Sequence, residues 1–355
     1  MVTITFGISC TRMPTAPRIP VTVEGRISGP SGEPLRGAFV SFQPGETAWA
    51  EWETAATDSL GLYKVSLLSG KYAVFVYPPD DYGAPVHDDR VAFSSSHGRY
   101  DFSFQGFRVT GRVIGPTGAP IDSGYVSAQS PGTHGGARSP LANGSYSLLL
   151  PGGTYSFNAR DADYLSGLPG RSITGVAISA DVAMDIELNG IPVSGHVYGP
   201  DGLPMGDVRV RADYVVQSVT EADGSYLLYP PSGTYRIWFQ PPSPFYIFPR
   251  VTDPVTIGGP VSIDADLSGA EWTGTVRRVG TGESVSDVTL LVRQVGDELR
   301  RVAAIRSGPQ GEFRFVLERD RSYDLETYDS GTGEWTIRLQ AVAATADTTF
   351  EILIP

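Results

Sequence analysis

Cysteine is almost missing from this chain, since Cys10 is the only one among its 355 residues. A lone thiol excludes an intrachain disulfide, so packing and hydrogen bonds must hold the fold together. Long hydrophobic runs are missing as well, and no apolar stretch approaches the roughly 20 residues that a membrane-spanning helix needs. Histidine is scarce, and none of the four begins a His-Glu-x-x-His motif, which excludes the common zinc-peptidase site.

Catalytic motifs and positive charge are also missing. The sequence contains neither a Gly-x-Ser-x-Gly nucleophile elbow nor a P-loop, and no set of nucleophile, base and orienting residue can be assembled from it. The formal net charge is −12, and an acidic chain repels phosphate backbones. We therefore expect a protein that is not an enzyme, has no cofactor and does not bind nucleic acid.

What the chain does contain is a long series of short apolar runs between turn residues. Runs of Val, Ile, Leu, Tyr, Phe and Thr alternate with glycine (42 residues) and proline (28 residues), and no stretch has a strongly helical composition. This pattern is typical of many short strands. Hydrophobic residues make up 41% of the chain, which is enough to bury cores. The sequence therefore predicts an all-β protein.

One sequence unit is repeated four times along the chain. Its clearest copy is "ANGSYSLLLPGGTYSF" at 142–157, in which each of two turns leads into a short run that begins near a tyrosine. The first tyrosine recurs as Tyr63, Tyr146 and Tyr226, with Phe313 in the fourth copy, and the second recurs as Tyr72, Tyr155, Tyr235 and Tyr323. The repeat predicts four similar modules in tandem.

Side-chain parity within the unit predicts half-buried strands. Tyr146, Leu148 and Leu150 fall on one face of the first run, and a second alternating run begins at Tyr155. We expect "ANGS" to form a hairpin turn with Gly144 at positive φ, and the two runs to be partner strands. The tyrosines are then core anchors whose hydroxyls reach the backbone at a corner. Sheets with one apolar face must stack in pairs, which predicts β-sandwiches.

A second recurring piece precedes each tyrosine pair, as in "VTGRVIGPTGAPIDSGYVSA" from residue 109. Its Gly-Pro-x-Gly-x-Pro segment, present in the first three copies, predicts a tight turn between paired strands. The landmark glycine of this piece is Gly25, Gly111, Gly195 or Gly274, and in the last three copies a glycine five residues earlier (Gly106, Gly190 or Gly269) ends the preceding unit. The last strand of one unit therefore runs almost directly into the first strand of the next.

These landmarks divide the chain into a leader at 1–20 and modules at 21–106, 107–190, 191–269 and 270–355. We expect each module to be an Ig-like or prealbumin-like antiparallel β-sandwich. Because the joints are short and alike, the sequence predicts that the four modules form an elongated rod.

The succession V-x-G-x-V-x-G-P-x-G-x-P, D-G-x-Y and P-x-G-x-Y resembles the carboxypeptidase regulatory-like family, most closely at 109–157 and 193–239. The fourth copy departs from it at Phe313 and at Asp320 and Arg321, which replace the second glycine turn. The resemblance implies transthyretin-like, seven-stranded sandwiches. Modules of this family occur beside metallocarboxypeptidase domains, in outer-membrane receptors and in surface proteins, and they are grouped with starch-binding-like sandwiches. It therefore implies a glycan or a cell-surface protein as partner.

Aromatic residues in polar loops are the best binding candidates, because sugars stack their apolar faces on exposed rings. The candidates are Trp49, Trp52, Tyr82, Tyr164, Phe245 and Tyr246. Three of them, Tyr82, Tyr164 and Tyr246, are spaced 82 residues apart in equivalent loops. Each of these tyrosines either contacts a ligand or caps the core of its own module.

The acidic loop "PPDDYGAPVHDD" at 78–89 is the best metal candidate. Its residues Asp80, Asp81, Asp88 and Asp89 could offer oxygen ligands to a structural calcium ion. Their spacing does not match an EF-hand loop, and the other three modules lack the cluster. A solvated acidic loop is the alternative.

The N-terminal segment "MVTITFGISCTRMPTAP" resembles the end of a bacterial lipoprotein signal, in which Cys10 would carry a lipid anchor. No Lys or Arg precedes the apolar run, and Gly7 stands where such signals prefer leucine, so a plain Pro-rich leader is the alternative. We expect a bacterial, extracytoplasmic protein of the cell envelope, the outer surface or the medium. Its expected function is that of a structural or adhesive spacer or surface-interaction rod, and the alternative is a carbohydrate-binding protein.

Overall fold

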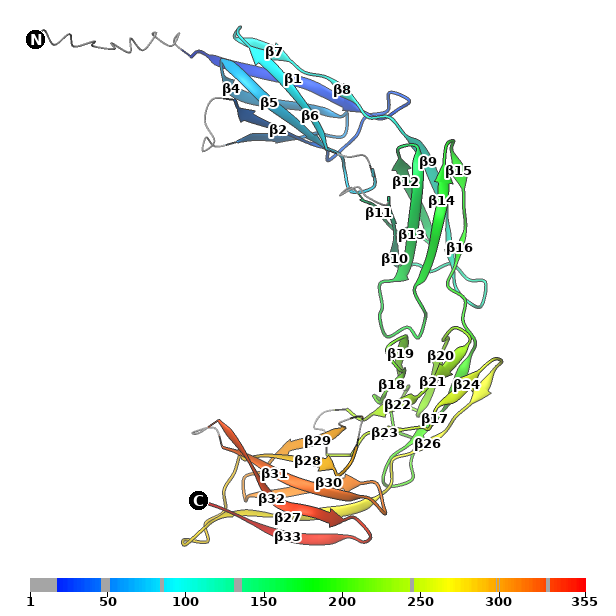
Figure 1. Ribbon diagram of the computed structural model, residues 1–355, viewed down its shortest axis with the longest axis vertical. Helices are drawn as coiled ribbons and strands as arrows, with labels where there is room; N and C mark the ends of the chain where they lie inside the picture. The colour runs from blue at the N-terminus through cyan, green and yellow to red at the C-terminus, as the bar shows by residue number, and fades with distance from the viewer. Residues whose placement is uncertain are drawn as a thin grey trace, which may run out of the picture.

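The computed structural model describes residues 18–45, 52–83, 86–130, 136–242, 246–297, 299, 301–329 and 333–355. These residues form 33 strands and no helix, so they include no helix that could span a membrane. The strands build four β-sandwich modules that follow one another without doubling back (Figure 1). The series is elongated and curves into an arc (Figure 1). The prediction of tandem all-β sandwiches is confirmed.

Each module repeats the same topology across two facing sheets, and module 1 shows it. Its first sheet contains β4 (Leu62–Leu68), β1 (Pro20–Ser28) and β7 (His97–Arg99) in that order, with β8 (Phe102–Ser103) also on β1. Its second sheet has the order β3 (Glu53–Ala56), β2 (Phe39–Pro44), β5 (Gly70–Tyr77) and β6 (His87–Phe93). The first and fourth strands are antiparallel, whereas the first and last are parallel. The strand positions therefore number seven, with the last one split in two.

Modules 2 and 3 follow this plan. In module 2 the first sheet contains β12 (Ser145–Leu150), β9 (Phe107–Ile114), β15 (Val182–Ala183) and β16 (Ile186–Glu187). The second sheet contains β11 (Gly136–Pro140), β10 (Gly124–Gln129), β13 (Gly153–Asp161) and β14 (Arg171–Ile178). In module 3 the first sheet contains β20 (Ser225–Leu228), β17 (Val193–Tyr198), β25 (Val261–Ser262) and β26 (Ala265–Asp266). The second sheet contains β19 (Val216–Val219), β18 (Arg209–Ala212), β22 (Ile237–Gln240) and β23 (Arg250–Val251). Strands β21 (Gly233–Tyr235) and β24 (Val255–Ile257) form an additional pair.

Module 4 differs in having an unbroken last strand. Its sheets are β30 (Glu312–Leu317), β27 (Ala270–Arg278) and β33 (Thr348–Ile354), and β29 (Val302–Arg306), β28 (Thr289–Gln294), β31 (Ser322–Asp329) and β32 (Glu334–Ala343). Strand β33 pairs with β27 without interruption from Trp272 to Arg278. At the divergent second turn, Asp320 adopts a φ of 60°, a conformation that aspartate tolerates better than most residues.

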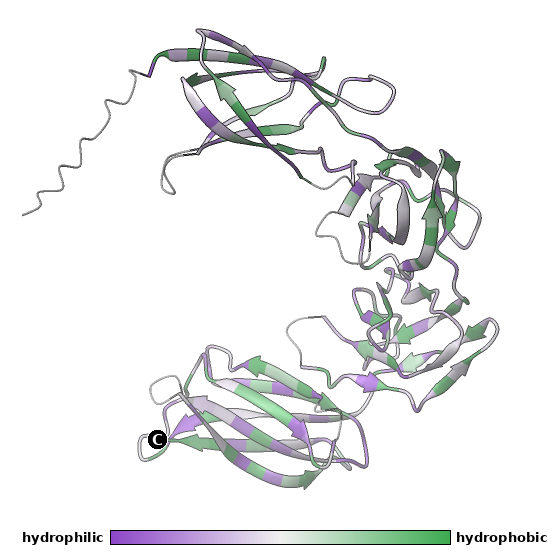
Figure 2. Ribbon diagram, turned by 45° about the horizontal axis from the view of Figure 1, so that its top comes forward, coloured by the Kyte–Doolittle hydropathy of each residue, from purple (hydrophilic) through white to green (hydrophobic). Residues whose placement is uncertain are grey.

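The cores lie between the two sheets of each module, as the parity of the repeat predicts. Apolar and polar residues alternate along most strands (Figure 2). Tyr146, Leu148 and Leu150 are buried on one wall of module 2, and Tyr155 and Phe157 on the other. The hydroxyl of Tyr155 donates to the carbonyl of Pro151 at 2.9 Å, so this tyrosine is a corner anchor as predicted.

The prediction that the conspicuous turns join paired strands is wrong, although the turns themselves are tight. "ANGS" closes a turn with Asn143 and Gly144 at φ of 51° and 76° and reciprocal hydrogen bonds between Ala142 and Ser145, but it leads from β11 in one sheet to β12 in the other. "PGGT" then carries the chain from β12 back to β13 in the sheet of β11. Parity cannot distinguish facing strands from paired strands, because both bury alternate residues alike.

The Gly-Pro-x-Gly-x-Pro segment is also a crossover rather than a hairpin. It is tight, since Gly115 N donates to Ala119 O at 2.8 Å and Gly118 has a φ of 82°. The flanking strands β9 and β10 nevertheless belong to different sheets. After the turn only one isolated bridge, Ile114 to Pro120, joins the two segments before the chain moves to the other sheet.

The landmark glycine and the first tyrosine meet at one carbonyl group. In module 2 a Cβ on Gly111 would lie 1.9 Å from the Met184 carbonyl oxygen, and the Tyr146 hydroxyl donates to that same oxygen at 2.6 Å. Nearby, Arg112 N donates to the Asp185 carboxylate at 2.8 Å. The same arrangement unites Gly25, Tyr63 and Tyr100 in module 1, and Gly195, Tyr226 and Ile263 in module 3. The glycine therefore makes room for a carbonyl that interrupts the last strand, and the tyrosine satisfies it.

Replacing Tyr226 with phenylalanine, the residue type that module 4 has at Phe313, should weaken module 3. The Tyr226 hydroxyl donates to Ile263 O at 2.7 Å inside the module, and such a bond contributes about 1 kcal/mol. Hydrogen exchange of peptides from module 3 should therefore become about fivefold faster. The matched change Tyr214→Phe, on a ring that is 89% exposed, should leave exchange unchanged. An equal effect of both changes would contradict this role of the hydroxyl.

The buried tyrosines should make the protein sensitive to alkaline pH. Burial raises the pKa of Tyr100 to about 12, and it raises the pKa of Tyr63, Tyr146 and Tyr226 further. An unfolded tyrosine ionises near pH 10. The stability that depends on their neutral form is thus complete below about pH 10 and is lost as the pH rises toward the folded pKa values. The melting temperature should fall above pH 10, and unfolding at such a pH should increase the tyrosinate absorbance, because the buried tyrosines ionise once they are exposed. A constant melting temperature from pH 9 to 12 would contradict this.

Candidate functional site

The three loops that carry Tyr82, Tyr164 and Tyr246 lie at the three joints between modules. Each loop, called a joint loop here, follows the fifth strand position of its module, namely β5, β13 or β22. Each one makes backbone hydrogen bonds to the next module along the chain. The equivalent spacing of the three tyrosines therefore marks a repeated joint.

At the first joint the loop residue Tyr82 is buried between modules 1 and 2. Leu149 N donates to Asp81 O and Gly83 N donates to Leu149 O, both at 2.9 Å. The ring of Tyr82 is 1% exposed, contacts Phe104 and shares the core of module 1 with Leu149. A ring in this position cannot stack on a ligand, so the prediction of Tyr82 as a binding residue is wrong.

The third joint exchanges core residues between neighbouring modules. Phe248 N donates to Val316 O at 2.9 Å, and Val316 N donates to Tyr246 O at 2.8 Å. Phe248 is fully buried in the core of module 4, whereas Val316 of module 4 belongs to the core of module 3. Tyr246 is half-buried, with the Arg314 guanidinium 5.6 Å from its ring centre. This tyrosine is therefore part of the joint, with one side of its ring covered.

The second joint leaves its tyrosine exposed. Gly167 N donates to Gln217 O at 2.9 Å, and Tyr229 N donates to Gly167 O at 2.8 Å. Gly167 has a φ of 75°, and a Cβ there would lie 2.5 Å from Leu227 O, so only glycine fits this contact. Tyr164, three residues earlier in the loop, is 68% exposed. Of the three equivalent tyrosines, it is the one that is free to meet a ligand.

The joint glycines explain the constant linker between modules. A Cβ would lie 2.8 Å from Leu150 O at Gly106, 1.8 Å from Tyr229 O at Gly190 and 1.9 Å from Leu317 O at Gly269. Each of these carbonyls lies at or just beyond the end of the fourth strand of the following module. The linker thus passes so close to the next module that a side chain at these positions would force the two apart.

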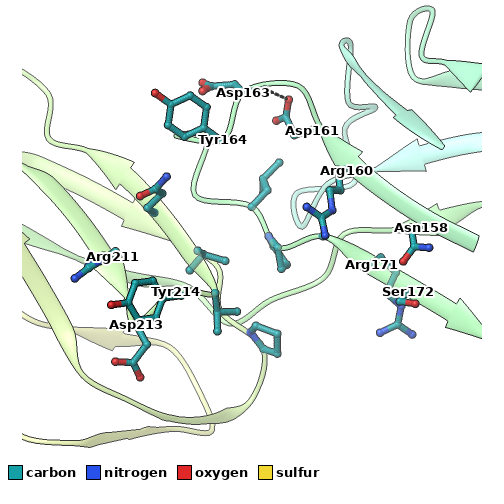
Figure 3. A pocket seen from close by; sticks show the side chains of 17 residues that line it. Asn158, Arg160, Asp161, Asp163, Tyr164, Arg171, Ser172, Arg211, Asp213 and Tyr214 are labelled. Carbon is teal, nitrogen blue, oxygen red and sulfur yellow. Dashed lines mark hydrogen bonds between the residues drawn. The ribbon is translucent and has the colours of Figure 1, made fainter. Parts of the chain in front are cut away.

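A pocket of about 530 Å³ lies between modules 2 and 3 (Figure 3). Its volume falls within the range of roughly 300–1,000 Å³ that is common for small-molecule sites. Tyr164 from the joint loop and Tyr214 from module 3 contribute two exposed rings to it. Polar groups from both modules complete the lining, including Asn158, Arg160, Asp163, Arg171, Ser172 and Gln217.

Tyr214 is held at the tip of the turn between β18 and β19. Asp213 has a φ of 46°, and Val215 N donates to Ala212 O at 3.0 Å to close the turn. The guanidinium of Arg211 lies 4.8 Å from the ring centre of Tyr214 and 4.5 Å from that of Trp238. The cation–π contacts orient Arg211 and the ring of Tyr214 at the edge of the pocket.

The charged groups of the pocket differ in their partners. Asp161 accepts a hydrogen bond from Asp163 N at 3.0 Å, and Asp163 accepts one from Leu165 N at 2.8 Å. In contrast, the guanidinium groups of Arg160 and Arg171 form no hydrogen bond or ion pair with any other residue in the described part of the chain. The carboxylates therefore shape the loop, while two guanidinium groups remain available to a ligand. Neither arginine nor Tyr214 was among the predicted site residues, although an aromatic residue after aspartate between two apolar runs, as in "RADYVV", is a usable signal.

Trp52 belongs to an exposed aromatic face on module 1. Its ring stacks on Phe75, with 5.6 Å between ring centres and 7° between planes, and it is 46% exposed. Phe39 and Tyr77, which are paired across β2 and β5, lie on the same outer face and are also exposed. This aromatic face is defined by Trp52, Phe75, Phe39 and Tyr77.

The acidic loop does not form the predicted calcium site. Asp80 and Asp81 are exposed in a turn whose carbonyl groups bond to module 2, and Asp88 and Asp89 are exposed on β6. Asp88 forms an ion pair with Arg90. Among the described residues no three His, Cys, Asp or Glu side chains are grouped so as to hold a metal ion. These four carboxylates therefore lack the convergence that calcium requires.

Three further predicted site residues, Trp49, Phe245 and Cys10, lie outside the described residues. The binding role of the two aromatic residues and the lipid at Cys10 stay predictions.

No protein-family model matches the chain, and no curated protein sequence matches it. Comparison with solved structures finds the TIE protein of Bacillus anthracis, at 11% identity over 89% of this chain and 68% of that one, with a TM-score of 0.23. It also finds BcpA, the major pilin subunit of Bacillus cereus (12%, 94% and 99%, 0.22), and the shaft pilin SpaA of Lactobacillus rhamnosus GG (11%, 46% and 97%, 0.23). At these identities and TM-scores the likeness carries no argument about function.

Proposed function

We propose that the protein is a non-enzymatic, extracytoplasmic spacer that holds its two ends at a fixed separation and orientation on a bacterial surface. The observation that carries this proposal is that backbone hydrogen bonds from a joint loop bridge each of the three joints between modules. Domains linked in one chain usually move relative to one another unless their interface is substantial. Here the interface extends into the cores, since Leu149 and Val316 are buried against the preceding module and Phe248 is buried in the following one.

The resemblance to the carboxypeptidase regulatory-like family supports the same proposal. The repeated glycine and tyrosine landmarks that resemble the family are the residues that build the seven-position sandwich and its joints. We propose that all four modules belong to this family, whose members include surface proteins, and that the divergent fourth module keeps its fold through a buried Phe313 and a continuous last strand.

Small-angle X-ray scattering tests the spacer. The measured curve should fit one curved arrangement of four modules, because backbone hydrogen bonds bridge all three joints and the first and third joints also share core residues. A compact particle, or a curve that only a broad ensemble of inter-module angles can fit, would overturn the proposal. Labelling of intact cells with a membrane-impermeant reagent tests the location, and a protein labelled only after lysis would exclude the surface.

A second function, carbohydrate binding, is favoured by the aromatic face of module 1. Contiguous exposed apolar surface often marks a binding site, and the stacked rings of Trp52 and Phe75, with Phe39 and Tyr77 exposed on β2 and β5, could stack on neutral sugar rings. Binding to neutral oligosaccharides on a glycan array should fall at least tenfold in Trp52→Ala. The change Trp335→Ala, at a tryptophan of similar exposure in module 4, is the control. Absence of binding by the unaltered protein would remove this second function.

A further inference from the structure

We infer that the pocket between modules 2 and 3 binds an acidic oligosaccharide, with a sugar ring against its tyrosines and a carboxylate on its arginines. This goes beyond the spacer proposed above, and it concerns a different site from the aromatic face of module 1. Figure 3 shows the rings of Tyr164 and Tyr214 on one side of the pocket and Arg160 and Arg171 on the other. The lining also contains three carboxylates that accept backbone hydrogen bonds, those of Asp161, Asp163 and Asp213.

The arginines indicate the charge of the ligand. Arg160 is the second-last residue of β13, and Arg171 is the first residue of the neighbouring strand β14. The protein has a net charge of −12, so anionic groups for pairing are abundant, yet neither guanidinium has a partner among the described residues. Guanidinium groups bind carboxylates through two parallel hydrogen bonds, a geometry that a ligand carboxylate can meet.

The tyrosines indicate a ligand with flat apolar faces. Tyr164 is 68% exposed and Tyr214 is 89% exposed, so a large part of each ring is available for contact. Tyrosine combines a rigid ring with low conformational entropy, which suits recognition surfaces. Sugar rings present apolar C–H faces to such rings, and their hydroxyl groups would meet the side chains of Asn158, Ser172 and Gln217 in the lining. An acidic peptide would also bind the arginines, but it has no apolar ring face to place against the two tyrosines.

The pocket is also preorganised. Tyr164 is tied to module 3 three residues later by the bonds of Gly167 to Gln217 and Tyr229, and Tyr214 is fixed by the turn at Asp213. The two rings come from different modules, but the joint sets their separation. A ligand therefore does not need to order the site, which lowers the free-energy cost of binding.

Isothermal titration calorimetry on the full chain tests the inference. The probes are trimers of galacturonate and of mannuronate, the neutral trimers of galactose and mannose, and a triglutamate peptide. At least one uronate trimer should bind, at least tenfold more tightly than its neutral counterpart, and its binding should weaken as salt is raised because the contacts are ionic.

Variants locate the binding. In Arg160→Gln/Arg171→Gln, affinity for the uronate trimer should fall at least tenfold, and in Tyr214→Ala at least threefold. All three side chains are exposed, so folding should be retained, which the melting temperature checks. The matched control is Arg36→Gln, an exposed arginine on module 1 without a described partner.

The inference is overturned if neither uronate trimer binds, if the double arginine variant binds as tightly as the unaltered protein, or if triglutamate binds as well as the sugars. These results would leave the spacer untouched, since that proposal depends on the scattering curve. A rigid arc without uronate binding would support the spacer alone, and uronate binding by a flexible chain would support the pocket alone.

Discussion

Replacing Gly195 with alanine is expected to destabilise module 3 by about 3 kcal/mol or more. The added Cβ would lie 2.0 Å from Ile263 O and 3.1 Å from the Asp264 carboxylate. Because the nearest group is backbone, the last strand itself has to shift. Such overpacking costs about 1–3 kcal/mol, and the shift also disturbs two hydrogen bonds, from the Tyr226 hydroxyl and from His196 N, each worth about 0.5–1.5 kcal/mol.

Hydrogen exchange resolved by module is the suitable measurement, because a chain of four modules does not unfold in one step. Exchange in β17, β20 and β25 should become more than a hundredfold faster, while module 1 keeps its rate. The control Gly258→Ala places a Cβ where nothing lies within 4 Å, so it should be nearly neutral. If Gly195→Ala is equally neutral, the close contact with Ile263 is not a constraint.

Replacing Phe248 with alanine is expected to affect two modules with one change. The ring is fully buried and packs edge-to-face on Tyr323 at 5.0 Å, with the Arg301 guanidinium 5.3 Å from its centre. Truncating a buried phenylalanine costs about 3–5 kcal/mol. Since Phe248 reaches module 4 from the joint loop of module 3, the loss should both weaken module 4 and release the third joint.

Two readouts separate these effects. Hydrogen exchange in β30 and β31 should accelerate at least a hundredfold, and small-angle scattering should show a broader distribution of sizes than in the unaltered protein. The control Phe39→Ala removes the same side chain from an exposed position on module 1 and should change neither. Faster exchange in module 4 with an unchanged scattering curve would mean that the ring stabilises module 4 without locking the joint.

Much of the fold could be predicted from the sequence because its signals are local. The period of two along each run and the glycines of the turns depend only on neighbouring residues, and they indicated the inward faces at Tyr146 and Tyr155 correctly. Strand partners could not be predicted in this way. β12 and β13 bury alternate residues whether they face each other or pair, so parity contains no information about which sheet each one joins.

The candidate site was harder to predict because it depends on contacts between modules. Tyr82 and Tyr164 occupy equivalent positions in the repeat, yet one is buried and the other is exposed. The difference lies in the residue that bonds to the next module: it is Gly83, directly after the first tyrosine, but Gly167, three residues beyond the second. Likewise, only the folded chain shows that the guanidinium groups of Arg160 and Arg171 form no ion pair with a described residue, although Asp161 and Asp163 line the same pocket.

The parallel pairing of the first and last strands has a mechanical consequence. In each module the chain enters at the start of the first strand and leaves at the end of its parallel neighbour, so tension along the molecule pulls the two strands past each other in shear. All the bonds between them then bear load together instead of opening one after another. Module 4 has seven consecutive residue pairs in this position, against two short runs of two pairs in module 2. Module 4 should therefore unfold at a higher pulling force than module 2.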